Sequence, residues 1–272
     1  MKKLVYGAGV LSALLMFGAC NRQPVNNTVK QTEQGSEVPE VMALHDKLTH
    51  DMPTELFYGS DSTRRALVDS LFPGGTIPAA MGCFYANLGK LTLFDAGLGA
   101  AQRGGIDSAL VAAGLHADSV RTIFITHCHA DHIGGLLAID GKAVYANADV
   151  WVPKVEYDYW IDKNELVAAV FKAYAPEKLH FFTYEEKLPQ GVQAIAAPGH
   201  TPGHTAYRFG NVLIAGDFMH GMELQKEHPE VSCKYDENPE MAAQSRKELL
   251  QLAADAKLTV YGHHLPNDGI LR

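Results

Sequence analysis

A run of three histidines and one aspartate within six residues is the strongest chemical signal in this sequence: His127-Cys128-His129-Ala130-Asp131-His132. Side chains two positions apart in an extended chain share a face, so His127 and His129 can converge on one point while Cys128 turns away. Imidazole and carboxylate are the usual protein ligands of zinc and similar divalent cations. The run therefore predicts a metal centre, although Asp131 could instead act only as a helix N-cap. The following Gly134-Gly135 pair is expected to let the backbone pass close to that centre.

Three later segments repeat the same arrangement, each an apolar run that ends in histidine or aspartate. They are Ala197-Pro198-Gly199-His200-Thr201-Pro202-Gly203-His204, Leu213-Ile214-Ala215-Gly216-Asp217 and Val260-Tyr261-Gly262-His263-His264. Ligands of layered α/β folds bind at the ends of strands, so these side chains are expected to meet. Together the segments supply enough donor atoms for two cations that share one site.

These motifs, with Phe94-Asp95-Ala96-Gly97 upstream, resemble those of the metallo-β-lactamase-fold hydrolases over roughly residues 80–270. The resemblance implies a four-layer αββα sandwich that holds two cations. It implies that the first cation is bound by His127, His129 and His200. It implies that the second is bound by Asp131, His132 and a histidine of the final pair, and that Asp217 bridges the two cations. Gly262-His263-His264-Leu265-Pro266 resembles a segment of the methyl-parathion-hydrolase-like branch, which favours His264, whereas other branches favour His263. The resemblance also implies that Asp95 orients a ligand imidazole and that His204 has a structural role.

The chemistry expected of such a centre follows from charge. Two divalent cations, with zinc expected, can share a bridging water and lower its pKa, which yields a hydroxide nucleophile at neutral pH. Asp131 could then help to move a proton to the leaving group. The sequence therefore predicts a metal-dependent hydrolase of an ester-like bond in a small molecule: a lactone, an aryl ester, or a related acyl or phosphoryl ester.

Differences between this sequence and the motifs of individual branches of that family narrow the range of expected substrates. Asp217 stands where the di-zinc β-lactamases with this histidine motif lack an acid, and His129 stands where flavin-partnered di-iron members carry glutamate. Many N-acyl homoserine lactonases have tyrosine where this chain has His220, and the segment Gly216-Asp217-Phe218-Met219-His220 resembles the methyl-parathion-hydrolase-like branch, whose members are similar to lactonases and arylesterases. The alternatives left open are a β-lactamase, a glyoxalase II-like thioester hydrolase, a non-catalytic metal-binding lipoprotein and an iron dioxygenase.

Composition agrees with one folded domain and with a small-molecule substrate. The chain has 272 residues, 47% of them hydrophobic, and a net charge of −8. A nucleic-acid partner is not expected, because phosphate neutralisation calls for a basic excess that this chain lacks. The oligomeric state is not predicted.

The elements that must position the motifs alternate between strand and helix patterns, as in layered α/β domains. Strands are expected over 91–94, 122–126, 143–146, 193–196 and 258–261, a hairpin over 206–214, and helices over 108–115, 164–174 and 241–256. Six aromatic residues between Trp151 and Tyr174 could line a pocket beside the metals or pack a helical layer against the sheet.

The N-terminal residues predict export. Residues 1–20 have two lysines, an apolar run and small residues before Cys20, which is typical of a signal peptide and resembles a lipoprotein cleavage site. Residues 21–40 are polar and are expected to form a flexible tether to the domain at 41–272. We expect an exported protein, periplasmic or anchored to a membrane through lipidated Cys20. Among the other cysteines, Cys83 and Cys233 could form a disulfide, which spacing alone does not establish.

Overall fold

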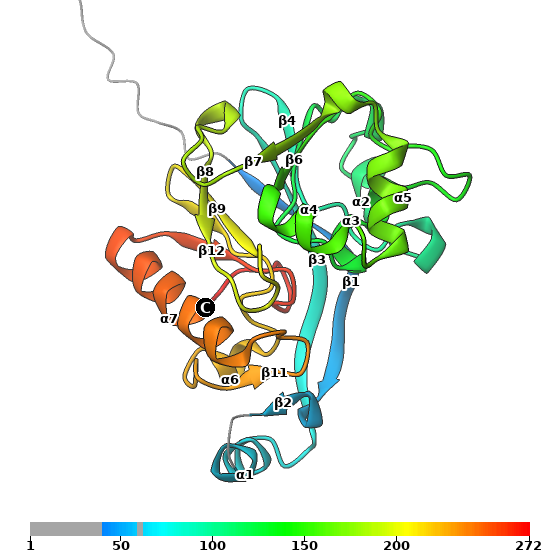
Figure 1. Ribbon diagram of the computed structural model, residues 1–272. Coiled ribbons are helices and arrows are strands. Elements are labelled where there is room, and N and C mark those ends of the chain that lie inside the picture. Colours follow the sequence, from blue (N-terminus) through cyan, green and yellow to red (C-terminus); the bar gives the residue numbers. More distant parts are fainter. Residues whose placement is uncertain (1–39, 59–61) are drawn as a thin grey trace, which may run out of the picture. The chain divides into compact units, whose positions relative to one another are not determined.

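The computed structural model describes residues 40–58 and 62–272. The expected signal peptide, Cys20 and the tether up to residue 39 lie outside the described residues. Two sheets pack face to face, and helices cover the outer face of each sheet (Figure 1). In the part of the chain that is described, no helix combines the length and apolar character needed to cross a membrane.

The first sheet has six strands in the order β1-β3-β4-β5-β6-β7; β4 to β7 run parallel to one another, and the β1–β3 and β3–β4 pairs are antiparallel. Its strands are β1 (Val41–Pro53), β3 (Thr76–Asn87), β4 (Leu91–Phe94), β5 (Thr122–Phe124), β6 (Asp149–Pro153) and β7 (Leu179–Phe182). The helices beside it are α2 (Ile106–Ala112), α3 (Ala130–Ile133), α4 (Lys154–Trp160) and α5 (Glu165–Ala173). The parallel order places the ends of β4 and β5, which carry Asp95 and His127, side by side.

The second sheet has four strands in the order β12-β10-β9-β8. These are β8 (Gln193–Ala196), β9 (Thr205–Phe209), β10 (Val212–Ile214) and β12 (Thr259–Tyr261), and helix α7 (Pro239–Ala256) covers them. A small pair of strands, β2 (Phe57–Tyr58) and β11 (Ser232–Cys233), lies near α1 (Ser62–Leu71) and α6 (Met222–Gln225). Short 3-10 helices occupy Thr54–Leu56, Ala100–Gln102, Ala117–Ser119, Gly134–Leu136, Pro176–Lys178 and Pro189–Gly191.

Alternating side chains on the strands build separate core layers. In β5, Ile123 joins the cluster beneath the helices of the first sheet, whereas Phe124 joins the cluster between the two sheets. In β10, Ile214 enters the same inter-sheet cluster and Leu213 packs with Leu249 of α7. Such alternation is what a strand buried on both faces requires, because successive side chains point to opposite faces. The predicted αββα sandwich is confirmed.

Aromatic rings fill the space between the sheets. Phe94 of β4 stacks on Phe209 of β9, with ring centroids 5.2 Å apart, and Phe124 lies 5.2 Å from Tyr207. Each pair joins one sheet to the other. Offset and tilted aromatic pairs of this kind stabilise by about 0.5–1.5 kcal/mol beyond the area that they bury. The sheets are thereby fixed close to the edge at which the metal-binding motifs lie.

Two expectations about local structure are wrong. Residues 143–146 do not form a strand: Ala143 makes a single bridge with Leu137, and the chain then turns, with Ala148 N donating to the Tyr145 carbonyl at 2.9 Å. Burial of the Tyr145 side chain in the helix–sheet core accounts for this apolar run. Cys83 and Cys233 do not form a disulfide either, because both are free thiols buried in different core clusters.

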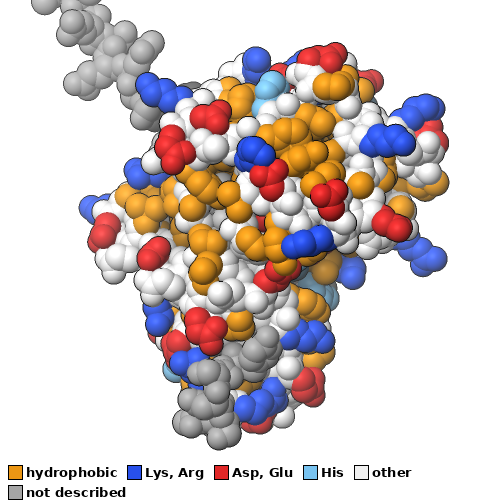
Figure 2. Space-filling view, viewed as in Figure 1, with side chains coloured by type: hydrophobic (Ala, Val, Ile, Leu, Met, Phe, Trp, Pro, Cys, Tyr) orange, Lys and Arg blue, Asp and Glu red, His pale blue; other side chains and the backbone are white. Residues whose placement is uncertain are grey.

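The face of the molecule drawn in Figure 2 carries interspersed acidic and basic side chains. The Lys and Arg side chains on that face do not gather into a basic patch. This distribution agrees with the acidic composition of the chain.

Candidate metal centre

Three imidazoles from two loops meet at the edge of the sandwich. His127 and His129 follow β5, and His200 lies in the turn between β8 and β9. The Nε2 atom of His127 lies 3.0 Å from Nδ1 of His129, and Nε2 of His200 lies 3.1 Å and 3.0 Å from these two atoms. The segment 127–129 is irregular rather than extended strand, yet its two histidines converge as predicted.

A second group lies beside the first and contains Asp131, His132, His263 and His264. The Asp131 carboxylate lies 3.5 Å from Nε2 of His263, 3.6 Å from Nε2 of His264 and 3.9 Å from Nε2 of His132. Helix α3 explains how Asp131 and His132 enter this group, because it begins directly after His129 and turns both inward. His129, rather than Asp131, is the N-cap residue of α3.

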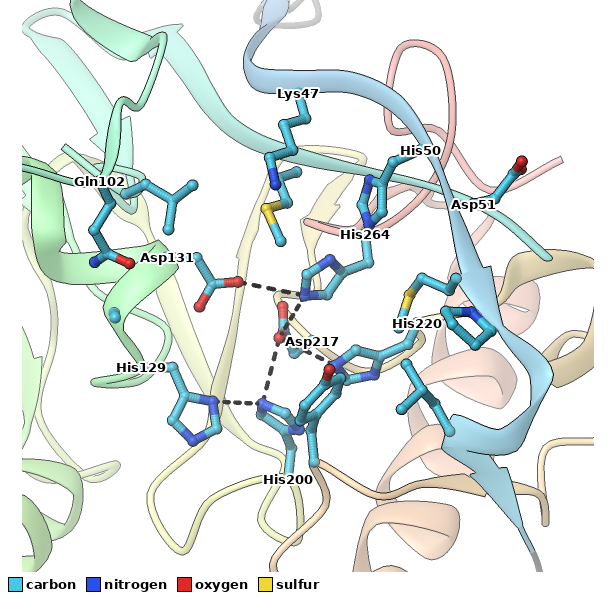
Figure 3. Close-up of a pocket in the computed structure, with 17 residues that line it drawn as sticks. Lys47, His50, Asp51, Gln102, His129, Asp131, His200, Asp217, His220 and His264 are labelled. Atoms are coloured by element: carbon cyan, nitrogen blue, oxygen red, sulfur yellow. Dashed lines mark hydrogen bonds and ion pairs between the residues drawn. The ribbon is translucent and has the colours of Figure 1, made fainter. Parts of the chain in front are cut away.

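Asp217 lies between the two groups and is 2% exposed. Its Oδ2 atom is 3.0 Å from His264 Nε2 and 3.3 Å from His200 Nε2 (Figure 3). Its Oδ1 atom is 3.1 Å from His132 Nε2. The residue follows β10 after Gly216, whose φ of +55° and close approach to His204 leave little room for a side chain. One carboxylate therefore contacts imidazoles of both groups.

The donor atoms fit a pair of divalent cations. The far nitrogens of three histidines are each paired away from the centre: Nδ1 of His132 with Asp95 at 2.8 Å, Nδ1 of His200 with Asp236 at 3.0 Å, and Nδ1 of His264 with the Ala80 carbonyl at 3.0 Å. A proton on each of these far nitrogens leaves the Nε2 lone pair facing the centre, which is the tautomer that binds a metal. Nε2 of His132 and both ring nitrogens of His263 are buried without a hydrogen-bond partner. Nitrogen and oxygen donors in this number are the ligands that zinc prefers.

In the absence of a cation, the pKa values of these side chains are shifted in different directions. Burial lowers the pKa of His129 to about 3, with the neighbouring His200 adding to the shift. For His200 burial acts in the same direction, but the hydrogen bonds to Asp217 and Asp236 outweigh it and raise its pKa to about 9. Burial would raise the pKa of Asp217, yet the charges of His264 and His132 hold it well below its usual range. The centre thus keeps an ionised carboxylate among imidazoles, and such a site favours added positive charge.

Two residues beside the ligand groups have the contacts predicted for them. Asp95 accepts hydrogen bonds from the backbone N–H and the hydroxyl of Thr126, both at 2.8 Å, and its other contact orients His132. Nδ1 of His204 donates to the Ala197 carbonyl at 3.0 Å, and its Nε2 accepts the backbone N–H of Asp217 at 3.0 Å. His204 therefore supports the backbone of Asp217, and both of its ring nitrogens are used in these hydrogen bonds.

The Gly134-Gly135 pair does not approach the metal centre, contrary to expectation. A Cβ atom on Gly134 would lie 2.2 Å from the Leu98 carbonyl oxygen, and one on Gly135 would lie 1.9 Å from the Ala96 carbonyl oxygen. The two glycines let the chain after α3 pack against the backbone of the loop after β4.

Three residues near the centre are not identified by the sequence motifs. Asp236 binds His200, and buried Arg246 lies 3.5 Å from the other Asp236 oxygen. His220, treated above only as a difference between branches, has its Nε2 atom 3.4 Å from Asp217 and stacks on His264 with centroids 4.6 Å apart. Burial and the charge of His264 lower the pKa of His220 to about 4. The spacing of His220 from Asp217 is the one sequence signal that pointed to it.

A cavity of about 540 Å³ opens onto both groups. Its lining includes His129, Asp131, His200, Asp217, His220 and His264 (Figure 3). It also includes Lys47, His50, Met52, Leu56 and Met81, which come from β1 and its neighbours. None of the aromatic residues between Trp151 and Tyr174 lines this cavity. Of these, Tyr157, Trp160, Phe171 and Tyr174 pack in the helix–sheet core, which favours the packing interpretation.

Comparison with known proteins agrees with this geometry. A family model described as the metallo-beta-lactamase superfamily matches residues 84–263. The chain belongs to this superfamily. It is 26% identical over 170 residues to the N-acyl homoserine lactonase AiiA of Bacillus thuringiensis subsp. kurstaki, a match that covers 60% of this chain and 63% of the lactonase. The chain thus spans less than two thirds of that curated relative.

Two solved structures of this superfamily are similar over most of their length. The hydrolase AbOPH superposes with a TM-score of 0.74 at 28% identity, covering 85% of this chain and 89% of that one. AidC, a dizinc quorum-quenching lactonase solved with a product, N-hexanoyl-L-homoserine, superposes with a TM-score of 0.75 at 25% identity and the same coverage. The proteins that this chain resembles thus include a hydrolase and lactonases.

Proposed function

We propose that the protein is a binuclear metallohydrolase that cleaves the ester bond of lactones or of related small esters. The observation that carries this proposal is the position of Asp217, whose carboxylate contacts imidazoles of both donor groups. A shared carboxylate between two donor groups is expected of a site for two cations, whereas a storage site for one ion requires no such bridge. We propose zinc as the metal and His264, rather than His263, as the ligand from the final pair.

The residues of the chain then have distinct roles. Two divalent cations bound there would polarise the ester carbonyl and lower the pKa of a water molecule so that hydroxide is available at neutral pH. Asp131 lines the cavity and is the most exposed of the acidic groups in the centre, with 19% of its side chain accessible. Its carboxylate is therefore placed to pass a proton to the departing alkoxide.

The shape of the cavity favours an ester with a modest apolar substituent. Met52, Leu56 and Met81 contribute apolar side chains to its lining. Lys47 and Gln102 contribute hydrogen-bond donors (Figure 3). Apolar walls with a few polar groups are typical of small-molecule sites, in which the polar groups fix the orientation of the ligand. An N-acyl lactone has this combination of an apolar chain, an amide and a strained ester. The lactonases among the relatives support the same substrate class.

The test is turnover by the purified protein before and after treatment with a chelator. The panel contains N-acyl homoserine lactones of graded chain length, an aryl ester, a thioester and a β-lactam, and elemental analysis gives the cation content. We expect two cations per chain, hydrolysis of the lactones or the aryl ester, loss of activity on chelation, and recovery with Zn²⁺. Asp217→Asn should abolish turnover, whereas Asp158→Asn on the exposed face of α4 should not. Absence of chelator-sensitive turnover on every substrate would overturn the proposal, and one iron per chain would instead indicate a dioxygenase.

A further inference from the structure

A buried carboxylate outside both donor groups joins the two loops that carry the first of them. Glu156 lies in the first turn of helix α4 and is 0% exposed. Its Oε1 atom accepts the backbone N–H of Cys128 at 2.9 Å and the indole N–H of Trp160 at 2.7 Å. Its Oε2 atom accepts the hydroxyl of Thr201 at 2.8 Å and the backbone N–H of Gly203 at 2.9 Å.

The partners of Glu156 flank the histidines of one donor group. Cys128 lies between His127 and His129, and Thr201 follows His200 directly. The first loop leaves the six-stranded sheet, and the second joins two strands of the four-stranded sheet. At their bases, the two loops are already joined by the backbone hydrogen bond from Thr205 N to the Thr126 carbonyl at 3.0 Å. Glu156 makes a second connection, nearer to the imidazoles, that fixes the distance between the loops.

We propose that Glu156 is a positioning residue that holds the loops of His127, His129 and His200 in register and thereby sets the affinity of this donor group for its cation. The inference rests on the proposed binuclear centre. It assigns Glu156 no contact with the substrate or the cation. The proposal concerns the first donor group alone, because Asp131, His132 and the final histidine pair share no hydrogen bond with Glu156.

The chemistry of the four contacts requires a carboxylate. All four partners are donors, and an ionised carboxylate is the side chain that offers only acceptors. Glutamine would turn an NH₂ group toward two of these donors and leave them unpaired in a buried site, which costs more than the loss of a hydrogen bond exposed to water. Burial raises the pKa of Glu156, and the four donated hydrogen bonds oppose that shift.

Close packing makes this arrangement sensitive to small changes. A Cβ atom on Gly203 would lie 2.4 Å from the backbone nitrogen of Glu156, so the second loop rests directly on the start of α4. Trp160 adds a second restraint, because its ring lies edge-on to His129 with centroids 5.6 Å apart while its N–H holds Oε1. Outer partners of metal ligands typically change cation affinity by about 10–100-fold when they are removed.

The experiment compares Glu156→Gln and Thr201→Val with the wild type, using Glu165→Gln in the exposed first turn of α5 as the matched control. Zn²⁺ affinity and stoichiometry are measured by competition with a chromogenic chelator, the Co²⁺-loaded proteins are compared by absorption spectroscopy, and thermal unfolding is followed without metal. We expect Glu156→Gln to bind one cation as tightly as the wild type and the other about 10–100-fold more weakly, with a changed Co²⁺ spectrum. Thr201→Val, which removes one donor of four, should show a smaller change in the same direction, and Glu165→Gln should match the wild type.

The outcomes distinguish this inference from the proposed function. A wild type that binds two cations, together with variants that bind both with unchanged affinity, would overturn the role of Glu156 and leave the binuclear hydrolase intact. A folded Glu156→Gln that loses both cations equally would also overturn it, because the effect would then be general. If Glu156→Gln does not fold, Thr201→Val decides, since an unchanged affinity for both cations in that variant contradicts the inference. A wild type that binds no cation would overturn the proposed function itself.

Discussion

Arg246→Met is the substitution for which the structure gives the largest expected loss of stability outside the metal centre. Arg246 of α7 is 1% exposed. Its Nε atom donates to the Phe218 carbonyl at 2.6 Å, and Nη1 donates to the carbonyls of Pro229 at 2.6 Å and Val231 at 3.1 Å. Nη2 lies 3.5 Å from Asp236. The guanidinium therefore joins the loop after β10, the segment before β11 and the carboxylate that orients His200.

The expected magnitude follows from what the substitution leaves behind. Methionine fills similar space, but it removes the donors to three carbonyl oxygens and the cationic partner of the buried Asp236 carboxylate. Removing one member of a buried ion pair costs about 3–5 kcal/mol. At about 2–4 °C per kcal/mol for a domain of this size, the unfolding midpoint should fall by about 6–20 °C.

Thermal unfolding of the metal-free protein, followed by circular dichroism, measures this loss. Arg246→Lys keeps the charge but not the fork of donors and should lie between methionine and the wild type. Arg272→Met, which removes an exposed pair with Asp268, should leave the midpoint unchanged. If Arg246→Met unfolds within about 2 °C of the wild type, the guanidinium is not the connection that its contacts indicate.

Three further predictions address the centre, the backbone and the thiols. His264→Asn should bind one cation fewer than the wild type, and His263→Asn should retain both. The reason is that Nδ1 of His264 is held by the Ala80 carbonyl and its Nε2 atom lies 3.0 Å from Asp217. Metal analysis that shows the reverse would assign the ligand to His263. Gly135→Ala should lower the free energy of unfolding, measured with urea, by about 3 kcal/mol or more, because the new Cβ would lie 1.9 Å from the Ala96 carbonyl oxygen. Gly74→Ala is the control: its Cβ would meet no atom within 4 Å, so the substitution should be neutral. Burial raises the pKa of Cys233 to about 12, so its thiol stays protonated in the folded state, whereas the unfolded thiol ionises near pH 8.5. The contribution of this thiol to the free energy of unfolding is therefore complete below pH 8.5 and falls by about 3 kcal/mol up to pH 10.5. The free energy of unfolding of Cys233→Ala, measured against pH, should lack that fall.

The sequence predicts the layers, and the meeting of the motif histidines and aspartates at one edge, because both depend on patterns within short segments. An apolar strand followed at once by histidine or aspartate, as at Thr126-His127 and Gly216-Asp217, identifies a strand end, and strand ends of two packed sheets share an edge. The same local reading fails at residues 143–146, where an apolar run is buried by a turn rather than by a strand. Propensity does not distinguish these cases, because burial of Tyr145 is decided by distant helices.

The part of the cavity lining that comes from β1 and its neighbours is the part of the site that no motif indicates. It comes from β1, whose pairing with β3 contains register shifts around Lys47. Residues such as Lys47, Met52 and Leu56 have no spacing typical of a binding site, and their role follows only from the position of β1 beside the cavity. Substrate preference depends on this part of the lining, so the sequence predicts the reaction type more readily than the substrate.

Two of the partners that hold these histidines are not predicted, for a related reason. The motif at residues 94–97 indicates Asp95, whereas no motif indicates Asp236 or the Ala80 carbonyl, which pair with the far nitrogens of His200 and His264. The contact of His264 with Ala80 spans 184 positions. Any carboxylate or carbonyl can serve, so the residue type carries little information and only the contact does. These contacts also have a physical consequence, because imidazoles whose tautomers are fixed before a cation arrives lose little further conformational freedom when it binds. Differences in cation affinity within this superfamily should therefore follow these acceptors, and the loop connection at Glu156, as much as the histidines themselves.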